Sequence, residues 1–283
     1  MMGKTLFVSD LDGTLLNSDS RLSERSVSLL NEAIEKGALF SIATARTPST
    51  VAGLLKDVKA NLPFIVMTGS AIWNPADKTF SHSITMKPEI AEEILSIIRK
   101  HNLPAFIYKL HDEKIHIYHT GLLSPLEKKF IAERDHSEYK IFHIHEDGES
   151  DIEFPLEGVS LFYSMQPSAL VEETFNEIRE KIDCNPIFYH DMYGEETGIM
   201  EIFAKGASKA NALKLLKEIS GADRVVAFGD NLNDIPMLRD ADVAVAVENA
   251  VPEVKRIADV IIGKNTAEAV PEFILRATES SGN

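Results

Sequence analysis

The sequence contains a single cysteine, Cys184, among its 283 residues. One cysteine excludes a disulfide within the chain and favours a reducing compartment such as the cytoplasm. Long apolar runs are also missing, whereas a membrane-spanning helix needs about 20 apolar residues. The few residues before the first apolar segment leave no room for a signal peptide. We therefore expect a cytoplasmic protein with no membrane partner.

Positive charge is scarce in this chain. There are 29 Lys and Arg residues against 44 Asp and Glu residues, which gives a net charge of −15. A surface of this sign repels nucleic acid and anionic lipid, so neither is an expected partner. It also weakly repels an anionic substrate, so a phosphate site would need a local cation such as a metal ion or a well-placed lysine.

Two kinds of pattern alternate along the chain. In the first 82 residues, short apolar segments alternate with segments of helical periodicity, and the same pattern resumes at Ser208. This pattern predicts a parallel sheet covered by helices. Ser23 is the expected N-cap of the first helix. The middle of the chain mixes hairpin-like alternation with helices, which predicts an inserted α+β domain. We expect a core domain of residues 1–82 and 190–283, and an insertion of residues 83–189 whose last strand extends to about residue 200 at most.

The most informative segment follows the first predicted strand and reads Asp10-Leu11-Asp12-Gly13-Thr14. Side chains at positions i and i+2 of an extended segment point to the same face. Asp10 and Asp12 can therefore reach one ligand while Leu11 faces the protein. A simple turn is the alternative, because Asp and Gly are common turn residues. Polar segments after three other strands favour a functional site over that alternative.

Ligands of open parallel sheets bind outside the carboxyl ends of the strands, so the residues there are candidates for a site. Thr44 and Arg46 follow the second strand and offer a hydroxyl and a cation to a phosphate group, although a strand end and a surface charge explain them equally well. Lys209 falls in the first turn of a predicted helix, where the helix dipole disfavours a cation. This position favours a functional role for Lys209, with Lys205 as the alternative.

Residues 229–234 form the second strong signal, since Asp230, Asn233 and Asp234 crowd the start of a predicted helix after a buried strand. Asp230 beside Asp10 would create a site of hard oxygen ligands, which suits Mg²⁺. Capping of the helix by Asn233 or Asp234 would explain one of these side chains but not the cluster.

Together, the four segments resemble the motifs of the haloacid dehalogenase-like (HAD) superfamily, and most closely those of the Cof-type phosphatases of subfamily IIB. The resemblance covers essentially the whole chain and implies an α/β fold, in which a Rossmann-like parallel-sheet core carries an inserted α+β cap of the C2B type. The chain departs from the family pattern at Ala45, where Gly is usual, and at Thr68, where Asn is frequent. The matching segments are Asp10–Leu16, Ala43–Arg46, Ser208–Ala210 and Gly229–Leu238.

The resemblance implies a phosphatase that hydrolyses a phosphomonoester of a small metabolite, most readily a sugar phosphate, through an aspartyl-phosphate intermediate. Asp10 is implied to be the nucleophile and Asp12 the acid and base. Mg²⁺ is implied to bind Asp10, the backbone carbonyl of Asp12 and Asp230, with Asp234 acting through water. The expected phosphate and substrate contacts are Thr44, Arg46, Lys209 and Asn233.

Three other functions compete with this one. A dehalogenase would share the nucleophile but would need neither Mg²⁺ nor a second acid, so Asp12 and Asp230 argue against it. A phosphomutase of the same superfamily would need an aspartyl-phosphate that survives until a second hydroxyl attacks it. A sensor of phosphorylated ligands would be expected to lack Asp10 or Asp12, and this chain has both.

Overall fold

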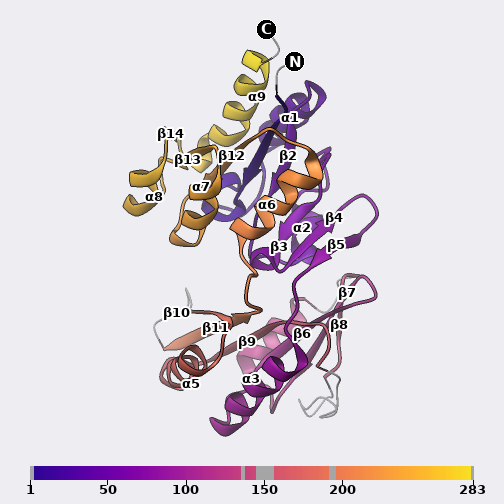
Figure 1. Cartoon of the computed structure of the whole chain (residues 1–283), viewed down its shortest axis with the longest axis vertical. Helices are drawn as coiled ribbons and strands as arrows, with labels where there is room; N and C mark the ends of the chain where they lie inside the picture. Colours follow the sequence, from indigo (N-terminus) through magenta and orange to yellow (C-terminus); the bar gives the residue numbers. More distant parts are fainter. Residues whose placement is uncertain (1–2, 135–137, 145–155, 191–195, 282–283) are drawn as a thin grey trace. The chain divides into compact units, whose positions relative to one another are not determined.

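The computed structural model describes residues 3–134, 138–144, 156–190 and 196–281. The chain divides into two compact units, of which the first comprises residues 1–82 and 208–283 and the second residues 83–207 (Figure 1). From the sequence, the division was expected at residue 190, with a last strand of the insertion that reached about residue 200. The division falls later because β11 (Thr197–Phe203) hydrogen-bonds to two strands of the second unit.

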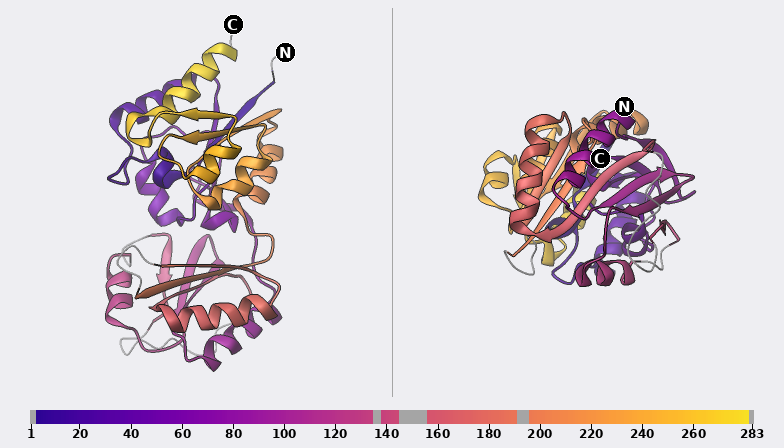
Figure 2. Two further views of the ribbon diagram at one scale, coloured as in Figure 1. Left: turned by 90° about the vertical axis from the view of Figure 1, so that its left-hand side faces the viewer. Right: turned by 90° about the horizontal axis from the view of Figure 1, so that it is seen from below.

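The first unit is built on a five-stranded parallel sheet in the order β14-β13-β12-β1-β2 (Figures 1 and 2). From β1 the chain moves outward to β2, and from β12 it moves outward in the opposite direction to β13 and β14. The junction between β1 and β12 is therefore the topological switch point, where open α/β sheets bind their ligands. The strands are β1 (Thr5–Ser9), β2 (Leu39–Ile42), β12 (Arg224–Gly229), β13 (Val243–Val247) and β14 (Val260–Ile262).

Helices connect these strands, and parallel connections are almost always right-handed, so the helices of the two halves cover opposite faces of the sheet. Ser23 caps α1 by accepting a hydrogen bond from the Ser26 amide, as its position predicted. The C-terminal helix α9 returns to pack against α1. The helices are α1 (Glu24–Glu35), α2 (Pro48–Leu54), α6 (Lys209–Ser220), α7 (Ile235–Asp240), α8 (Pro252–Ile257) and α9 (Ala269–Ser281).

A hairpin that the sequence analysis missed follows β3 (Phe64–Val66). It consists of β4 (Ala71–Asn74) and β5 (Thr79–Ser83), which form a three-stranded sheet with β3. In the sequence, this hairpin is indicated only by a short apolar run that ends in the polar turn of residues 75–78. This signal is weak because both strands are short.

The second unit is the predicted α+β insertion. Its six-stranded sheet has the order β10-β11-β9-β6-β7-β8 and is antiparallel except where β7 pairs with β8. Helices α3 and α5 pack together over an apolar core that includes Ile98, Phe162 and Met200 (Figure 2). The further elements are β6 (Phe106–His111), β7 (Lys114–His119), β8 (Lys140–Phe142), β9 (Val159–Pro167), β10 (Asn185–His190), α3 (Pro88–Lys100), α4 (Pro125–Ala132) and α5 (Ser168–Lys181).

Within the described ranges, no helix combines the length and the apolar character that crossing a membrane requires.

Glu127 carries a fully buried carboxylate in the second unit. Its Oε1 lies 3.1 Å from Nε2 of His119 and accepts a hydrogen bond of 2.8 Å from Gln166, while Oε2 accepts one of 2.8 Å from the Ser124 amide. Burial alone would raise the pKa of Glu127, but the hydrogen bonds from His119 and Ser124 hold it below its usual range. The carboxylate therefore joins the start of α4 to the sheet.

Replacing Glu127 by alanine is expected to lower the free energy of unfolding of the second unit by about 3–5 kcal/mol, because its buried partners lose their acceptor. Urea unfolding can be followed by tyrosine emission, since all six tyrosines lie between residues 83 and 207. Glu133→Ala is the matched control, because this half-exposed carboxylate should change stability by no more than about 0.5 kcal/mol. Equal effects of the two substitutions would contradict the role given to Glu127.

Candidate functional site

Three carboxylates meet where β1 and β12 end. Asp10 follows β1, Asp230 follows β12, and Asp234 lies at the start of α7, with one oxygen of each within 4.8 Å of the others. The sequence predicted that Asp10 and Asp230 would lie side by side, and the separation of less than 4.8 Å between their carboxylate oxygens confirms it. Hard oxygen ligands at this spacing suit a divalent cation such as Mg²⁺.

The ammonium group of Lys209 lies between two of these carboxylates. Its Nζ donates hydrogen bonds to Asp10 Oδ1 at 2.5 Å and to Asp234 Oδ1 at 2.8 Å, and its side chain is only 2% exposed. Burial works against a charged lysine, but the carboxylates of Asp10 and Asp234 raise its pKa above the ordinary value. Lys209 begins α6, as predicted, and the unfavourable helix position is offset by these two ion pairs.

The remaining charge at the cluster is negative. If all three carboxylates are ionised, the ammonium of Lys209 leaves two negative charges without a counter-charge at the cluster. Burial raises the pKa of Asp10 to about 7 against the opposing effect of Lys209, and burial also raises the pKa of Asp230. A bound cation would offset both effects and keep the carboxylates ionised.

Asp234 has two roles at once, which explains why it is fully buried. One oxygen accepts from Lys209, and the other accepts from the backbone amides of Asp230 and Asn231 at 3.0 and 3.1 Å. The sequence analysis weighed helix capping by Asn233 or Asp234 as an alternative to a functional role. Asp234 does cap this turn, together with Asn231 as the N-cap residue, and it belongs to the cluster as well.

The contacts of Asp12 differ from those of the three clustered carboxylates. Its side chain is half exposed, and both of its oxygens accept hydrogen bonds from Arg46, at 2.7 Å from Nε and 2.6 Å from Nη2. Leu11 between the two acids is fully buried, as predicted, but it begins a helical turn (Leu11–Leu15) instead of continuing the extended strand. The predicted phosphate contact Arg46 is therefore engaged with Asp12 in this structure.

The other two predicted phosphate contacts differ in their surroundings. Thr44 is buried at the end of β2, where its hydroxyl accepts a hydrogen bond of 3.1 Å from the Arg46 amide. Asn233 is exposed in the turn before α7. Their roles toward phosphate stay predictions.

Three residues that position the site were missed by the sequence analysis. Thr14 donates a hydrogen bond of 2.7 Å to Asp230 Oδ1 and so ties the first motif to the fourth. The amide groups of Asn249 and Asn265 donate to the carbonyls of Gly13 and Leu16 at 2.7 and 2.8 Å. Only Thr14 lay inside a motif, and the two asparagines carried no sequence signal of their own.

The comparisons with known proteins agree with this geometry. A family model described as haloacid dehalogenase-like hydrolase matches residues 7–274. This chain belongs to the haloacid dehalogenase-like hydrolases. Within that family it is a phosphatase of the Cof type, as its motifs predicted.

Two curated relatives match nearly the full length of this HAD phosphatase. Pyridoxal phosphate phosphatase of Escherichia coli is 26% identical over 273 residues, which cover 94% of this chain and 95% of the relative. The 5-amino-6-(5-phospho-D-ribitylamino)uracil phosphatase of Bacillus subtilis is 22% identical over 273 residues, which cover 95% and 96%.

Solved structures share the fold. A haloacid dehalogenase-like hydrolase from Bacteroides thetaiotaomicron has a TM-score of 0.77 at 25% identity, covering 97% of this chain and 99% of that one. A sugar phosphatase of HAD subclass IIB has a TM-score of 0.70 at 20% identity, covering 97% and 98%. The predicted parallel-sheet core with an inserted antiparallel-rich unit is therefore confirmed.

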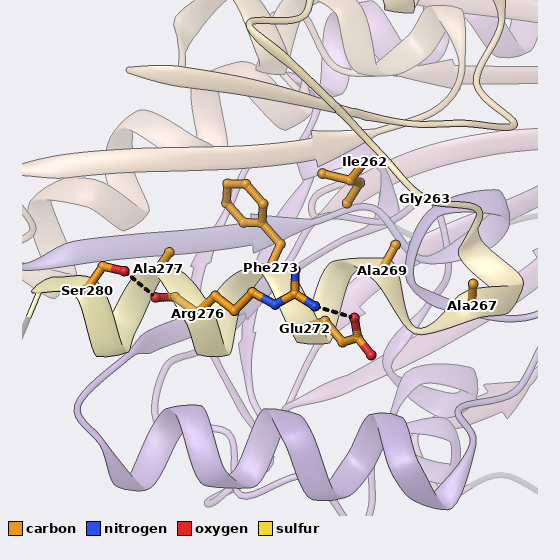
Figure 3. Close-up of a pocket in the computed structure, with 9 residues that line it drawn as sticks. All are labelled: Ile262, Gly263, Ala267, Ala269, Glu272, Phe273, Arg276, Ala277 and Ser280. Atoms are coloured by element: carbon orange, nitrogen blue, oxygen red, sulfur yellow. Dashed lines mark hydrogen bonds and ion pairs between the residues drawn. The ribbon is translucent and has the colours of Figure 1, made fainter.

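A hollow of about 590 Å³ lies beside α9 of the phosphatase (Figure 3). Phe273 and Ile262 line it together with small side chains, and its charged groups Arg276 and Glu272 form an ion pair of 3.0 Å. Its lining shares no residue with the carboxylate cluster.

A strained turn supports the start of α6. Met67, Thr68 and Gly69 all have positive φ angles of 51, 56 and 88°, a region that a β-branched residue such as Thr68 rarely adopts. A Cβ at Gly69 would lie 2.2 Å from the backbone oxygen of Ser208, the residue before Lys209. The absence of a side chain at position 69 is therefore what lets α6 bring Lys209 to the cluster.

Replacing Gly69 by alanine is expected to displace Ser208 and Lys209, and so to lower both phosphatase activity and stability. Gly37→Ala is the matched control, because Gly37 also has a positive φ of 102° but has open space around it. Both variants carry the left-handed strain of about 1–2 kcal/mol, and Gly69→Ala carries an overpacking cost of about 1–3 kcal/mol in addition. Unfolding followed by emission of the only tryptophan, Trp73, compares them; identical losses would refute the contact argument.

Proposed function

We propose that this phosphatase hydrolyses a phosphomonoester of a small metabolite through an aspartyl-phosphate on Asp10, with Mg²⁺ as its cofactor. The observation that carries the proposal is the contact of the Lys209 ammonium with Asp10 and Asp234 at the sheet's switch point. A nucleophile, a fixed cation and a cluster of oxygen ligands are the parts that phosphoryl transfer needs.

In the first step, a carboxylate oxygen of Asp10 attacks phosphorus and forms a P–O bond, while the bond from phosphorus to the leaving oxygen breaks. Asp12 gives a proton to that oxygen. In the second step, Asp12 takes a proton from water as the water oxygen attacks phosphorus, which releases inorganic phosphate and restores the Asp10 carboxylate. Positioned proton transfer of this kind contributes about 10²–10⁴-fold to a rate.

The donor set fits Mg²⁺. We propose that Asp10, Asp230 and the backbone carbonyl of Asp12 hold the ion, with Asp234 acting through water, since both oxygens of Asp234 already accept hydrogen bonds. When bound, the ion would add positive charge that stabilises the phosphoryl group in the transition state. Lys209, which contacts Asp10, would also contact the phosphate, and Thr44 and Asn233 would donate further hydrogen bonds.

The substrate class follows from the chemistry of the site and from the two named relatives. Those relatives act on pyridoxal phosphate and on a phosphorylated ribitylaminouracil, according to their names, and both substrates are small phosphate esters. This supports a small phosphorylated metabolite as the substrate, and we propose a sugar phosphate as the first candidate.

The proposal is tested by measuring phosphate release from a panel of sugar phosphates, nucleotides and phosphorylated cofactors, with Mg²⁺ and with EDTA. Release in Mg²⁺ that EDTA abolishes is the expected outcome, because the carboxylate cluster needs a cation to hold the phosphoryl group. Release from no panel member would refute the proposed substrate class, and equal release in EDTA would refute the cofactor.

Replacing Asp10 by asparagine is expected to lower kcat by at least about 10³-fold, since an amide oxygen is too weak a nucleophile to form the acyl phosphate. Asp57→Asn is the control, because Asp57 is an exposed carboxylate between α2 and β3. Mass spectrometry of the denatured wild type after rapid mixing with substrate should reveal phosphorylated Asp10. Hydrolysis that persists in the Asp10 variant would remove this residue from the mechanism.

A further inference from the structure

The paired hydrogen bonds between Arg46 and Asp12 are the starting point. Nε and Nη2 of one guanidinium contact the two oxygens of one carboxylate at 2.7 and 2.6 Å, which is the fork geometry that arginine forms and lysine does not. The Arg46 side chain is 26% exposed and that of Asp12 is 50% exposed. Without this contact, Asp12 would be a half-exposed side chain, free to change its rotamer.

The backbones that carry both side chains are fixed. The Arg46 amide donates to the Thr44 hydroxyl at 3.1 Å, and its carbonyl accepts from the Met67 amide at 3.0 Å. On the other side, the carbonyl of Gly13 next to Asp12 accepts from Asn249 at 2.7 Å. The ion pair therefore joins the turn after β1 to the turn after β2 through two rigid supports.

We propose that Arg46 is a positioning residue for Asp12, and that it determines how well the enzyme expels poor leaving groups. This inference rests on the proposed function, in which Asp12 gives its proton to the leaving oxygen as the P–O bond breaks. Arg46 itself neither gives nor takes a proton. Its fork contacts both oxygens and so fixes the plane of the carboxyl group from which the leaving oxygen takes its proton.

This role differs in a measurable way from a direct contact between Arg46 and phosphate. Every phosphate ester carries the same phosphoryl group, so losing a phosphate contact weakens all substrates alike and raises KM. Misplacing the acid affects only esters whose leaving oxygen needs a proton. Phenyl phosphate and 4-nitrophenyl phosphate are of similar size, but nitrophenolate departs readily without a proton whereas phenolate does not.

The experiment measures kcat/KM for both esters in the wild type, Arg46→Gln and Arg46→Lys. With Arg46→Gln, we expect a loss of about 10–100-fold for phenyl phosphate, within the range of acid catalysis, and of no more than about 3-fold for 4-nitrophenyl phosphate. Arg46→Lys keeps the charge but contacts one oxygen, so its loss for phenyl phosphate should be intermediate.

The same substitutions are then made together with Asp12→Asn. Because Arg46 acts through Asp12, Arg46→Gln should lower kcat/KM for phenyl phosphate by less than about 3-fold further in that background. A double-mutant cycle reports this result as full coupling.

Arg25→Gln is the matched control. Arg25 forms an ion pair of 2.8 Å with Glu272 between α1 and α9, so its loss should change neither ester.

Equal losses for the two esters with a raised KM would overturn the positioning role and assign Arg46 to phosphate. A further large loss in the Asp12→Asn background would also overturn it. A wild type that releases phosphate from neither ester and from no member of the metabolite panel would overturn the proposed function itself, which separates that failure from failure of the inference. Thermal unfolding of each variant shows whether it has lost activity only because it no longer folds.

Discussion

The structure of the site depends on one buried ammonium group. Three carboxylates within 4.8 Å of each other repel, and two of them are nearly excluded from water, which makes their charges costly. Lys209 offsets this cost through its contacts with Asp10 and Asp234. Asp234 then holds the turn after β12, so Asp10, Lys209 and the fourth motif are positioned by a single group of contacts.

The cluster could be predicted from the sequence because it follows from general sheet geometry. Carboxyl ends of parallel strands meet at one edge, so Asp10 and Asp230 had to be close once their strands were recognised as neighbours. Lys209 was identified by its unfavourable place in the first turn of a helix. The alternation of apolar and polar patterns was also sufficient to recognise an inserted α+β unit.

Other features could not be predicted, because they depend on which segments pair rather than on local patterns. The end of the insertion is one of them, since the last strand was expected to reach about residue 200 and the hydrogen bonds of β11 to β9 and β10 carry it to Phe203. Two of the contacts at the site join turns, and a turn has no periodic sequence pattern from which its path could be predicted. They are the paired hydrogen bonds between Arg46 and Asp12 and the hydrogen bond from Asn249 to Gly13. The β4–β5 hairpin was missed because its strands are short.

The position of Lys209 also bears on how the chain folds. Asp10 and its counter-ion are 199 residues apart, so the site closes only after the whole second unit has been synthesised. The entropy of closing a loop rises with the length of flexible chain between its ends. A second unit that has already folded leaves little flexible chain between the two halves of the first. Early folding of the insertion would therefore speed completion of the first unit, in a fold otherwise slowed by its long-range contacts.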